Sequence, residues 1–360
     1  NHDEERVHIL GDNCRKYNLP LFYVNQIGAQ TELIFDGESM VFNEKGEVLD
    51  QLAAFSEDLK VYEFEQNKVQ GLAPKTEDPE TDVAQIYQAL ILGIRDYFQK
   101  SGFKKTTLGL SGGIDSAVVC ALAVEALGPE NVVAVLLPSE FSSDHSIADA
   151  LALVQNVGCE QLTVPIKHAT EAFEAMLKPS FKDLPFNLTE ENIQSRSRAV
   201  VLMALSNKFG YILLNTSNKS ECAVGYGTLY GDMAGAISVL GDVYKTQVYQ
   251  LANYINRNRE IIPQNSIVKP PSAELRPGQK DSDSLPDYEV LDKLLFQFIE
   301  QKQSPSALIA QGFNESLVNK ILKLVNQAEF KRYQTPPILR VSPKAFGPGR
   351  RMPIVGKYLT

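Results

Sequence analysis

Apolar and polar positions follow two different patterns along the chain, and the change between them falls near Asp82. Before it, residues 3–17 place apolar side chains at helical spacing, and short β-rich runs follow at 21–25, 32–35, 39–43 and 48–52. This pattern predicts one amphipathic helix followed by strands of a sheet. The polar stretch 69–81, which contains Pro74 and Pro79, predicts a linker. We therefore expect one domain over residues 1–68 and another over residues 82–360.

From Asp82 onward, strand-length apolar runs alternate with helical patterns. Strands are predicted at 106–110, 132–137, 161–164 and 211–215, and helices at 83–100, 115–127, 145–157, 167–177 and 191–209. Strands separated by helices imply crossover connections, and so predict an α/β fold with a parallel sheet covered by helices on both faces. Ligands are expected at the carboxyl ends of such strands.

After Asn215 the pattern becomes richer in loops and then helical again. Helices are predicted at 245–257, 288–301, 304–311 and 314–329, followed by a basic tail at 331–357. The polar loop Pro270–Pro286 is long enough to close over a site as a lid, and a disordered loop would account for its composition nearly as well.

Charge and cysteine usage narrow the class of protein. The net charge of −9 gives the wrong field for a general nucleic-acid surface. No apolar run approaches the ~20 residues of a membrane span, and the first residues are unlike a signal peptide. The cysteines form no C-x-x-C pair, so we expect buried reduced thiols at Cys14, Cys120, Cys159 and Cys222. These features predict a cytoplasmic protein without nucleic-acid or membrane partners.

The sharpest chemical signal is the serine and glycine loop Ser111–Ser116, between a predicted strand and a predicted helix. Its glycines let successive backbone N–H groups point into one concavity, and the following helix adds the positive end of its dipole. The loop lacks the lysine of a Walker motif and does not match G-x-G-x-x-G. We expect it to bind phosphate. Asp115 would hold Mg²⁺ against the phosphates, or only stabilise the helix dipole.

A second polar cluster follows the predicted strand 211–215. Beside the first loop it would present Thr216 to adenine or ribose and Glu221 to a metal or substrate, and a simple helix cap is the alternative. Lys245 begins a later predicted helix, where its charge opposes the dipole. Contact with a phosphate would explain that lysine, and so would solvent exposure.

Several motifs in order carry a family resemblance. Ser111–Ser116 is similar to the S-G-G-x-D-S loop of the N-type ATP pyrophosphatases, which cleave ATP between the α and β phosphates. The chain from Asp82 to its C-terminus resembles the NAD synthetase family through this loop and the segments 191–198, 215–221, 230–232, Lys245 and 271–275. Residues 23–28 and 35–39 resemble the end of a nitrilase-type amidase domain, a family with an α-β-β-α fold. The combination resembles the glutamine-dependent NAD synthetases.

The resemblance implies a set of site residues. For ATP they are Gly109, Leu110, Ser111, Gly112, Gly113, Ile114, Asp115, Ser116, Thr216 and Ser272, the last where the family usually has Thr. For deamido-NAD they are Asn192, Arg196, Glu221, Asp232, Lys245 and Lys331. Mg²⁺ would be held by Asp115 and Glu221, which with Lys245 make up the implied catalytic set.

The implied reaction is the ATP-dependent amidation of deamido-NAD to NAD through an adenylated intermediate, with release of AMP and pyrophosphate. Ammonia would normally come from glutamine, through a Glu-Lys-Cys triad that the resemblance places upstream of Asn1. Cys14 lies on the inward face of a predicted helix and is not expected to be a nucleophile, so this chain should use ammonia and not hydrolyse glutamine. The expected partners are the glutaminase half of the same protein and further copies of this chain, as a homodimer or larger homo-oligomer.

Two alternatives stay open at this point. The chain could be a catalytically silent nucleotide-binding module, although Asp115, Glu221 and Lys245 argue against it. It could also be another N-type ATP pyrophosphatase amidotransferase. A tRNA-modifying enzyme on this loop would need a basic surface and reactive cysteines near the loop, and the acidic sequence offers neither.

Overall fold

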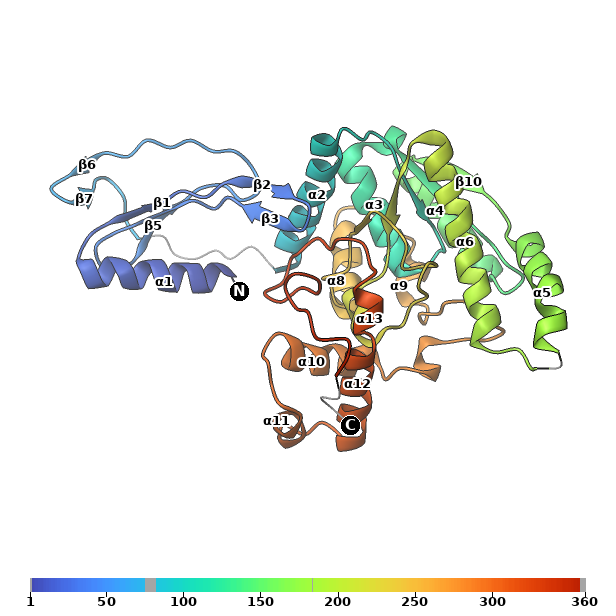
Figure 1. Cartoon of the computed structure of the whole chain (residues 1–360). Helices are drawn as coiled ribbons and strands as arrows, with labels where there is room; N and C mark the ends of the chain where they lie inside the picture. Colours follow the sequence, from blue (N-terminus) through green and yellow to red (C-terminus); the bar gives the residue numbers. More distant parts are fainter. Residues whose placement is uncertain (1, 75–81, 183, 357–360) are drawn as a thin grey trace.

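The N-terminal part of the chain forms a small lobe beside the main body (Figure 1). The computed structural model describes residues 2–74, 82–182 and 184–356. The lobe contains helix α1 (His2–Tyr17) and an antiparallel sheet of order β1-β4-β5, where β1 is Leu21–Tyr23, β4 is Met40–Phe42 and β5 is Val48–Gln51. Its core is built on Cys14, Met40 and Phe42. The predicted helix and the strands at 21–25, 39–43 and 48–52 are confirmed, with ends that differ by a residue or two.

A separate hairpin connects this lobe to the main body. Its strands are β2 (Ile27–Gln30) and β3 (Leu33–Asp36), of which the sequence pattern predicts only β3. The hairpin contacts helix α2 (Asp82–Ser101), where Asp96 accepts from the backbone N–H of Ala29 at 2.6 Å and Lys100 donates to its carbonyl at 2.8 Å. The lobe is thus joined to the main body by hydrogen bonds as well as by the chain.

Of the predicted linker 69–81, residues 69–74 lie within the described part of the chain. Val69 belongs to a two-stranded hairpin made by β6 (Phe64–Glu65) and β7 (Lys68–Val69), and residues 75–81 lie outside the described residues. The division into domains at 1–68 and 82–360 stays a prediction.

A five-stranded parallel sheet forms the centre of the main body, which confirms the predicted fold class. Its strands, in the spatial order β10-β9-β8-β11-β12, are β8 (Thr106–Gly109), β9 (Val132–Leu136), β10 (Glu160–Thr163), β11 (Ile212–Asn215) and β12 (Ile237–Ser238). Within this sheet the first strand in sequence is the central β8. The chain then adds β9 and β10 on one side of β8 and returns to add β11 and β12 on the other side. The order therefore reverses between β8 and β11, and a crevice opens at the carboxyl ends of strands at such a point.

Helices cover both faces of the sheet, as predicted. Side chains of a strand alternate between faces: Val132 and Ala134 of β9 belong to the core shared with the helices α2, α3 and α8, whereas Val133 and Val135 pack against α6. The helices are α3 (Ile114–Leu127), α4 (Asp144–Val157), α5 (Lys167–Phe181), α6 (Leu188–Phe209) and α8 (Lys245–Ile255), with a short 3-10 turn, η1 (Pro129–Asn131), after α3. Helix α6 begins three residues earlier than predicted because Asn187 and Glu190 form a capping box.

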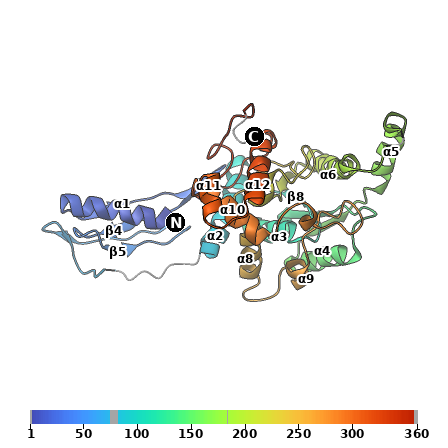
Figure 2. The ribbon, with the colours of Figure 1, turned by 90° about the horizontal axis from the view of Figure 1, so that it is seen from below.

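A C-terminal group of helices projects below the sheet in Figure 1, and in Figure 2, which is seen from below, α10 (Tyr288–Ile299), α11 (Pro305–Ala310) and α12 (Glu315–Gln327) lie in front of the main body. The group consists of these helices and α13 (Glu329–Arg332), which pack on α7 (Lys219–Val224) around a second apolar core. Two short elements, α9 (Gln264–Val268) and η2 (Asp281–Asp283), lie in the loops between α8 and α10. The predicted basic tail starts in α13, and Lys357 lies outside the described residues.

Two expectations from composition can be compared with the structure. All four cysteines are free and buried, as predicted. No helix within the described ranges is both long and apolar enough to cross a membrane.

Candidate functional site

The serine and glycine loop lies where β8 ends and α3 begins. Gly112 has φ +80°, and a Cβ there would lie 2.1 Å from the carbonyl oxygen of Ser146, so only glycine fits. The hydroxyl of Ser111 accepts from the N–H of Gly113 at 3.2 Å and contacts the hydroxyl of Ser116 at 3.1 Å. No side chain caps the N-terminus of α3. The first N–H groups of a long helix therefore face the crevice, which is an arrangement suited to an anion.

A buried charge cluster stands beside this loop. Lys245 is only 2% exposed, and its Nζ lies 2.5 Å from Oδ2 of Asp115 and 3.8 Å from Oε1 of Glu221. Asn218 donates to the other oxygen of Asp115 at 2.9 Å. The structure thus brings together three residues that lie far apart in the sequence, and it excludes the solvent-exposed alternative for Lys245.

The pKa values in this cluster follow from burial and mutual charge. Burial and the neighbouring Asp115 raise the pKa of Glu221 well above its usual range. Burial would lower the pKa of Lys245, but the charges of Asp115 and Glu221 outweigh it, so the pKa is raised. Lys245 is therefore a permanent cation between two carboxylates. This placement explains why a lysine is tolerated at the start of α8.

Two helix starts are held together behind the cluster by one residue. Asp292 of α10 accepts from the hydroxyl of Ser220 at 2.5 Å and from the backbone N–H of Thr246 at 2.8 Å. Ser220 in turn accepts from the backbone N–H of Lys245 at 2.9 Å. Asp292 therefore fixes the start of α7, which carries Glu221, against the start of α8, which carries Lys245.

Residues 215–221 are both a cap and part of the site. Asn218 caps the six-residue helix α7, since its side chain accepts from the N–H of Glu221 at 3.0 Å. Glu221 also faces Lys245, and Thr216 lines the crevice. The capping alternative raised by the sequence is therefore correct for Asn218 without excluding a site role for its neighbours.

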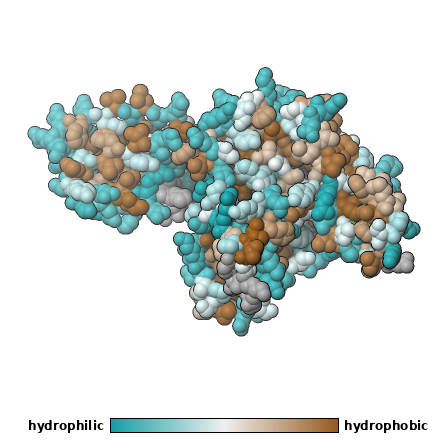
Figure 3. Space-filling view, viewed as in Figure 1, coloured by the Kyte–Doolittle hydropathy of each residue, from teal (hydrophilic) through white to brown (hydrophobic). Residues whose placement is uncertain are grey.

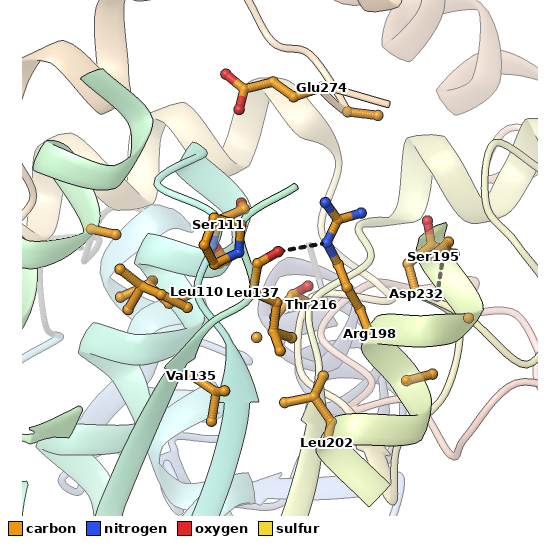
Figure 4. A pocket seen from close by; sticks show the side chains of 18 of the residues that line it. Leu110, Ser111, Val135, Leu137, Ser195, Arg198, Leu202, Thr216, Asp232 and Glu274 are labelled. Carbon is orange, nitrogen blue, oxygen red and sulfur yellow. Dashed lines mark hydrogen bonds between the residues drawn. The ribbon is translucent and has the colours of Figure 1, made fainter. Parts of the chain in front are cut away.

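Two adjoining cavities open from the crevice and share residues of the loop. One, of about 240 Å³, extends from Gly109, Leu110 and Ser111 between the sheet and α6, and Figure 4 shows its apolar walls at Val135, Leu137 and Leu202. The other, of about 460 Å³, contains the charge cluster. Ser111, Ser116, Ser146, Thr216, Asp232, Ala273 and Glu274 line both. A ligand with an apolar part and an anionic part could span the two.

The loop predicted as a lid, 270–286, lies over the second cavity. Ser272, which lines that cavity, donates to the carbonyl of Gln279 at 2.6 Å. Glu274 accepts from the hydroxyls of Ser143 at 2.7 Å and Ser146 at 2.8 Å. Arg276 forms an ion pair with Glu191 at 2.9 Å. These contacts hold the loop to the starts of α4 and α6.

The remaining residues implied for deamido-NAD gather around the glycine-rich loop 225–232. Thr228 joins two of them, since its hydroxyl donates to Asn192 at 2.7 Å and its N–H donates to Asp232 at 2.6 Å. Lys331 donates to the carbonyls of Gly225 and Gly227, and the exposed Arg196 donates to the carbonyl of Leu229 at 3.2 Å. Burial raises the pKa of Asp232 although Lys331 opposes this shift. Of these four, Asp232 alone lines the cavities described above.

Asp292 lies outside every motif that the sequence analysis names, whereas Arg198, Asn218 and Glu274 lie in the segments 191–198, 215–221 and 271–275 without a site role of their own being predicted. Only a charged side chain on a face that should be buried could have indicated Asp292 and Arg198. Glu274 gains its partners Ser143 and Ser146 from a distant segment, and so does Asn218 in its contact with Asp115, so these contacts could not be predicted from neighbouring residues.

The comparisons with known proteins agree with this architecture. The sequence model for the NAD synthase family matches residues 86–335. A glutamine-dependent NAD(+) synthetase of Synechocystis sp. is 49% identical over 98% of the chain. The chain spans 63% of that relative's length.

Two solved structures are also similar. The glutamine-dependent NAD+ synthetase of Acinetobacter baumannii, in complex with ADP, has 41% identity and a TM-score of 0.71 over 98% of this chain and 65% of its own. The NH3-dependent NAD synthetase of Campylobacter jejuni has 28% identity and a TM-score of 0.58, over 72% of this chain and 100% of its own. The family model matches most of the main body, one member is 49% identical over nearly the whole chain, and the central sheet is parallel with a serine and glycine loop after β8. The chain therefore belongs to the NAD synthase family.

Proposed function

We propose that this chain amidates deamido-NAD to NAD at the expense of ATP, with AMP and pyrophosphate as the other products. The observation that carries the proposal is the cluster of Asp115, Lys245 and Glu221 beside the uncapped start of α3. A cation and an open helix terminus at one place suit the pyrophosphate leaving group. The names of the relatives, which are NAD synthetases, point to the same reaction.

The reaction would proceed in two steps. The nicotinate carboxylate of deamido-NAD attacks the α-phosphorus of ATP, and the bond to the β-phosphate oxygen breaks as pyrophosphate leaves. N–H groups of the loop 111–116 and the ammonium of Lys245 hold the growing negative charge. Ammonia then attacks the carbonyl carbon of the mixed anhydride, AMP departs, and a proton is released. No nucleophile of the chain is needed, so its residues act by positioning and charge.

Mg²⁺ is part of the proposal, and the donor set fits it. In the described ranges no three or more His, Cys, Asp or Glu side chains are arranged to hold a metal by themselves. Asp115 and Glu221 supply two carboxylates at the phosphate end of the crevice, and Mg²⁺ in nucleotide sites is held by one or two carboxylates together with phosphates and water. The ion would add positive charge at the pyrophosphate.

Deamido-NAD is proposed to reach the crevice past Asn192, Arg196, Asp232 and Lys331.

A homodimer is proposed from the surface of α6. Val200 and Met203 follow Arg196 at helical spacing on α6 and are 64% and 39% exposed, and Figure 3 shows apolar surface over α5 and α6. A second copy of the chain packed on this face would lie next to Arg196. A homodimer is therefore part of the proposal.

The N-terminal lobe supports a proposal for the source of ammonia. Residues 1–68 would be the end of a nitrilase-type amidase domain that supplies ammonia from glutamine. Cys14 is buried, and burial raises the pKa of its thiol, which supports the view that it is not a nucleophile. The buried free thiols support a cytoplasmic setting as well.

The test is an assay of the chain with ATP, Mg²⁺, deamido-NAD and either ammonium or glutamine, with NAD and AMP both followed. NAD and AMP in equal amounts with ammonium, and none with glutamine, is the expected result. No product with either nitrogen source would favour a silent nucleotide-binding module. AMP formed only with a different carboxylate acceptor would favour another N-type amidotransferase.

A further inference from the structure

Arg198 of α6 reaches into the smaller cavity with most of its hydrogen-bonding capacity unused. Its Nε donates to the carbonyl of Leu137 at 3.0 Å, a contact drawn in Figure 4. Among the described residues its two terminal amino groups have no hydrogen-bond partner and no ion pair. A guanidinium has five N–H donors, so the side chain is fixed at one nitrogen and presents the others to the cavity that it lines.

The surroundings of Arg198 do not neutralise it. Asp232 and Glu274 lie close enough to act on its charge, but each is engaged elsewhere, by Thr228 and by Ser143 and Ser146. Burial lowers the pKa of Arg198 to about 10, against the effect of these two carboxylates. The guanidinium is thus a charged donor group in a mostly apolar cavity at neutral pH. An unpaired donor in such a place is expensive unless a ligand uses it.

The position of Arg198 separates it from the phosphate end of the crevice. It lines the smaller cavity together with Val135, Leu137 and Leu202, and none of these four lines the cavity that contains Lys245 and Asp115. The loop residues Ser111 and Ser116 border both cavities. A nucleotide with its phosphates on the loop therefore has its base, the flat and largely apolar part, in the smaller cavity beside Arg198.

We propose that Arg198 is a specificity-determining residue that donates from its terminal amino groups to ring-nitrogen acceptors of the adenine base. The proposal rests on the proposed function, since it requires ATP as the nucleotide. A guanidinium has donors and no acceptors, so it cannot pair with the exocyclic amino group of adenine and must face a ring nitrogen. Leu137 orients the guanidinium, and the apolar walls hold the plane of the base.

The first experiment separates the base from the phosphates. Binding of adenosine and of inorganic pyrophosphate is measured by calorimetry on the chain and its R198Q variant, with the exposed Lys208 of the same helix changed in K208Q as the matched control. R198Q is expected to lose about 10- to 100-fold in affinity for adenosine, the range for hydrogen bonds to a charged group, and to keep its affinity for pyrophosphate. Equal loss for both ligands, or no loss for either, would overturn the proposal.

The second experiment tests the contact itself. ATP analogues that lack one ring nitrogen, 1-deaza-, 3-deaza- and 7-deaza-ATP, are titrated into both proteins. One analogue should bind about 10-fold or more weakly than ATP to the unsubstituted chain and equally to ATP in R198Q. If no analogue shows this coupling, Arg198 does not contact a ring nitrogen. Failure of the unsubstituted chain to bind ATP would instead overturn the proposed function, and this inference with it.

Discussion

The ammonium of Lys245 lies 2.5 Å from the carboxylate of Asp115, although the two residues are 130 positions apart in the chain. One begins α8 and the other lies in the first turn of α3. Their meeting brings the positive end of a helix, a buried cation and a carboxylate to the same point of the crevice. Turnover should therefore be sensitive to any change that separates these three groups.

Replacement of Asp115 by Asn should reduce turnover by about 100-fold or more, the scale seen when a key electrostatic group is removed. The amide keeps the shape of the side chain but loses the charge that balances Lys245 and would hold Mg²⁺. The measurement is steady-state NAD and AMP formation over a range of Mg²⁺ concentrations, with the exposed Asp144 changed in D144N as the control. Normal turnover in D115N would exclude the metal role.

Asp292 should matter for activity although it lies behind the site. Removing its carboxylate in D292A leaves the hydroxyl of Ser220 and the N–H of Thr246 without their partner, which costs roughly 1–3 kcal/mol for each unsatisfied buried group. The starts of α7 and α8 then lose their common anchor. We expect kcat to fall about 10-fold while the KM for ATP changes little. The melting temperature of D292A with and without ATP separates lost alignment from general unfolding.

The raised pKa of Glu221 predicts a specific dependence of stability on pH. Its folded pKa lies above the unfolded value because of burial and Asp115. The favourable contribution is therefore complete at low pH and is lost as pH rises through the folded pKa. E221Q, which cannot ionise, should be more stable than the unsubstituted chain at about pH 8, with a difference that shrinks toward about pH 5.

Thermal melting across this pH range provides the measurement. The exposed Glu125, changed in E125Q, is the control and should show no such trend. The charges of Lys245 and Asp281 also act on the pKa of Glu221. The experiment is therefore repeated in a K245Q background, which removes the contribution of Lys245. A constant difference between E221Q and the unsubstituted chain at all pH values would contradict the prediction.

Two glycines with nearly the same backbone angle provide a matched test of the phosphate binding proposed for the serine and glycine loop 111–116. Gly112 has φ +80° and a Cβ there would meet the carbonyl oxygen of Ser146 at 2.1 Å, whereas Gly102 has φ +76° and open space around it. G102A should cost only the strain of the left-handed conformation, about 1 kcal/mol. G112A adds a clash with backbone and should lose more stability, together with pyrophosphate binding. Chemical denaturation and calorimetry test the pair, and equal losses would argue against a steric requirement at Gly112.

Most of the main-body elements can be predicted because their patterns are local. The strand at 106–110, the loop 111–116 and the helix after it are encoded within a few residues of one another. The hairpin strand Ile27–Gln30 escapes prediction because Gly28 interrupts its apolar run, and it is stabilised by packing on α2. β12 has two residues, too few for any periodicity.

Some residues of the candidate site can likewise be predicted from their neighbours in sequence, whereas others have partners that are distant in sequence. Asp115 and Thr216 follow strand ends and can be picked out for that reason. Lys245 can be noticed only as a charge in an unfavourable place, and its actual partners are distant in sequence. Glu274 and Arg198 lie in the motif segments 271–275 and 191–198, but their contacts could not be predicted, because the loop and helix that carry them meet the crevice only in the folded chain.

The order of the strands has a consequence for how the crevice between β8 and β11 forms during folding. β8 and β9 are joined after a short stretch of chain, but β8 and β11 are not, as the bond from Thr106 to the carbonyl of Ile212 spans 106 residues. Bringing β8 and β11 together costs the conformational entropy of the long chain segment between them. This cost precedes the stabilising contacts between the two strands. The serine and glycine loop 111–116 can therefore take shape early, while the crevice exists only once the second half of the sheet has docked. Nucleotide binding then reports on completion of the whole sheet and not on the loop alone.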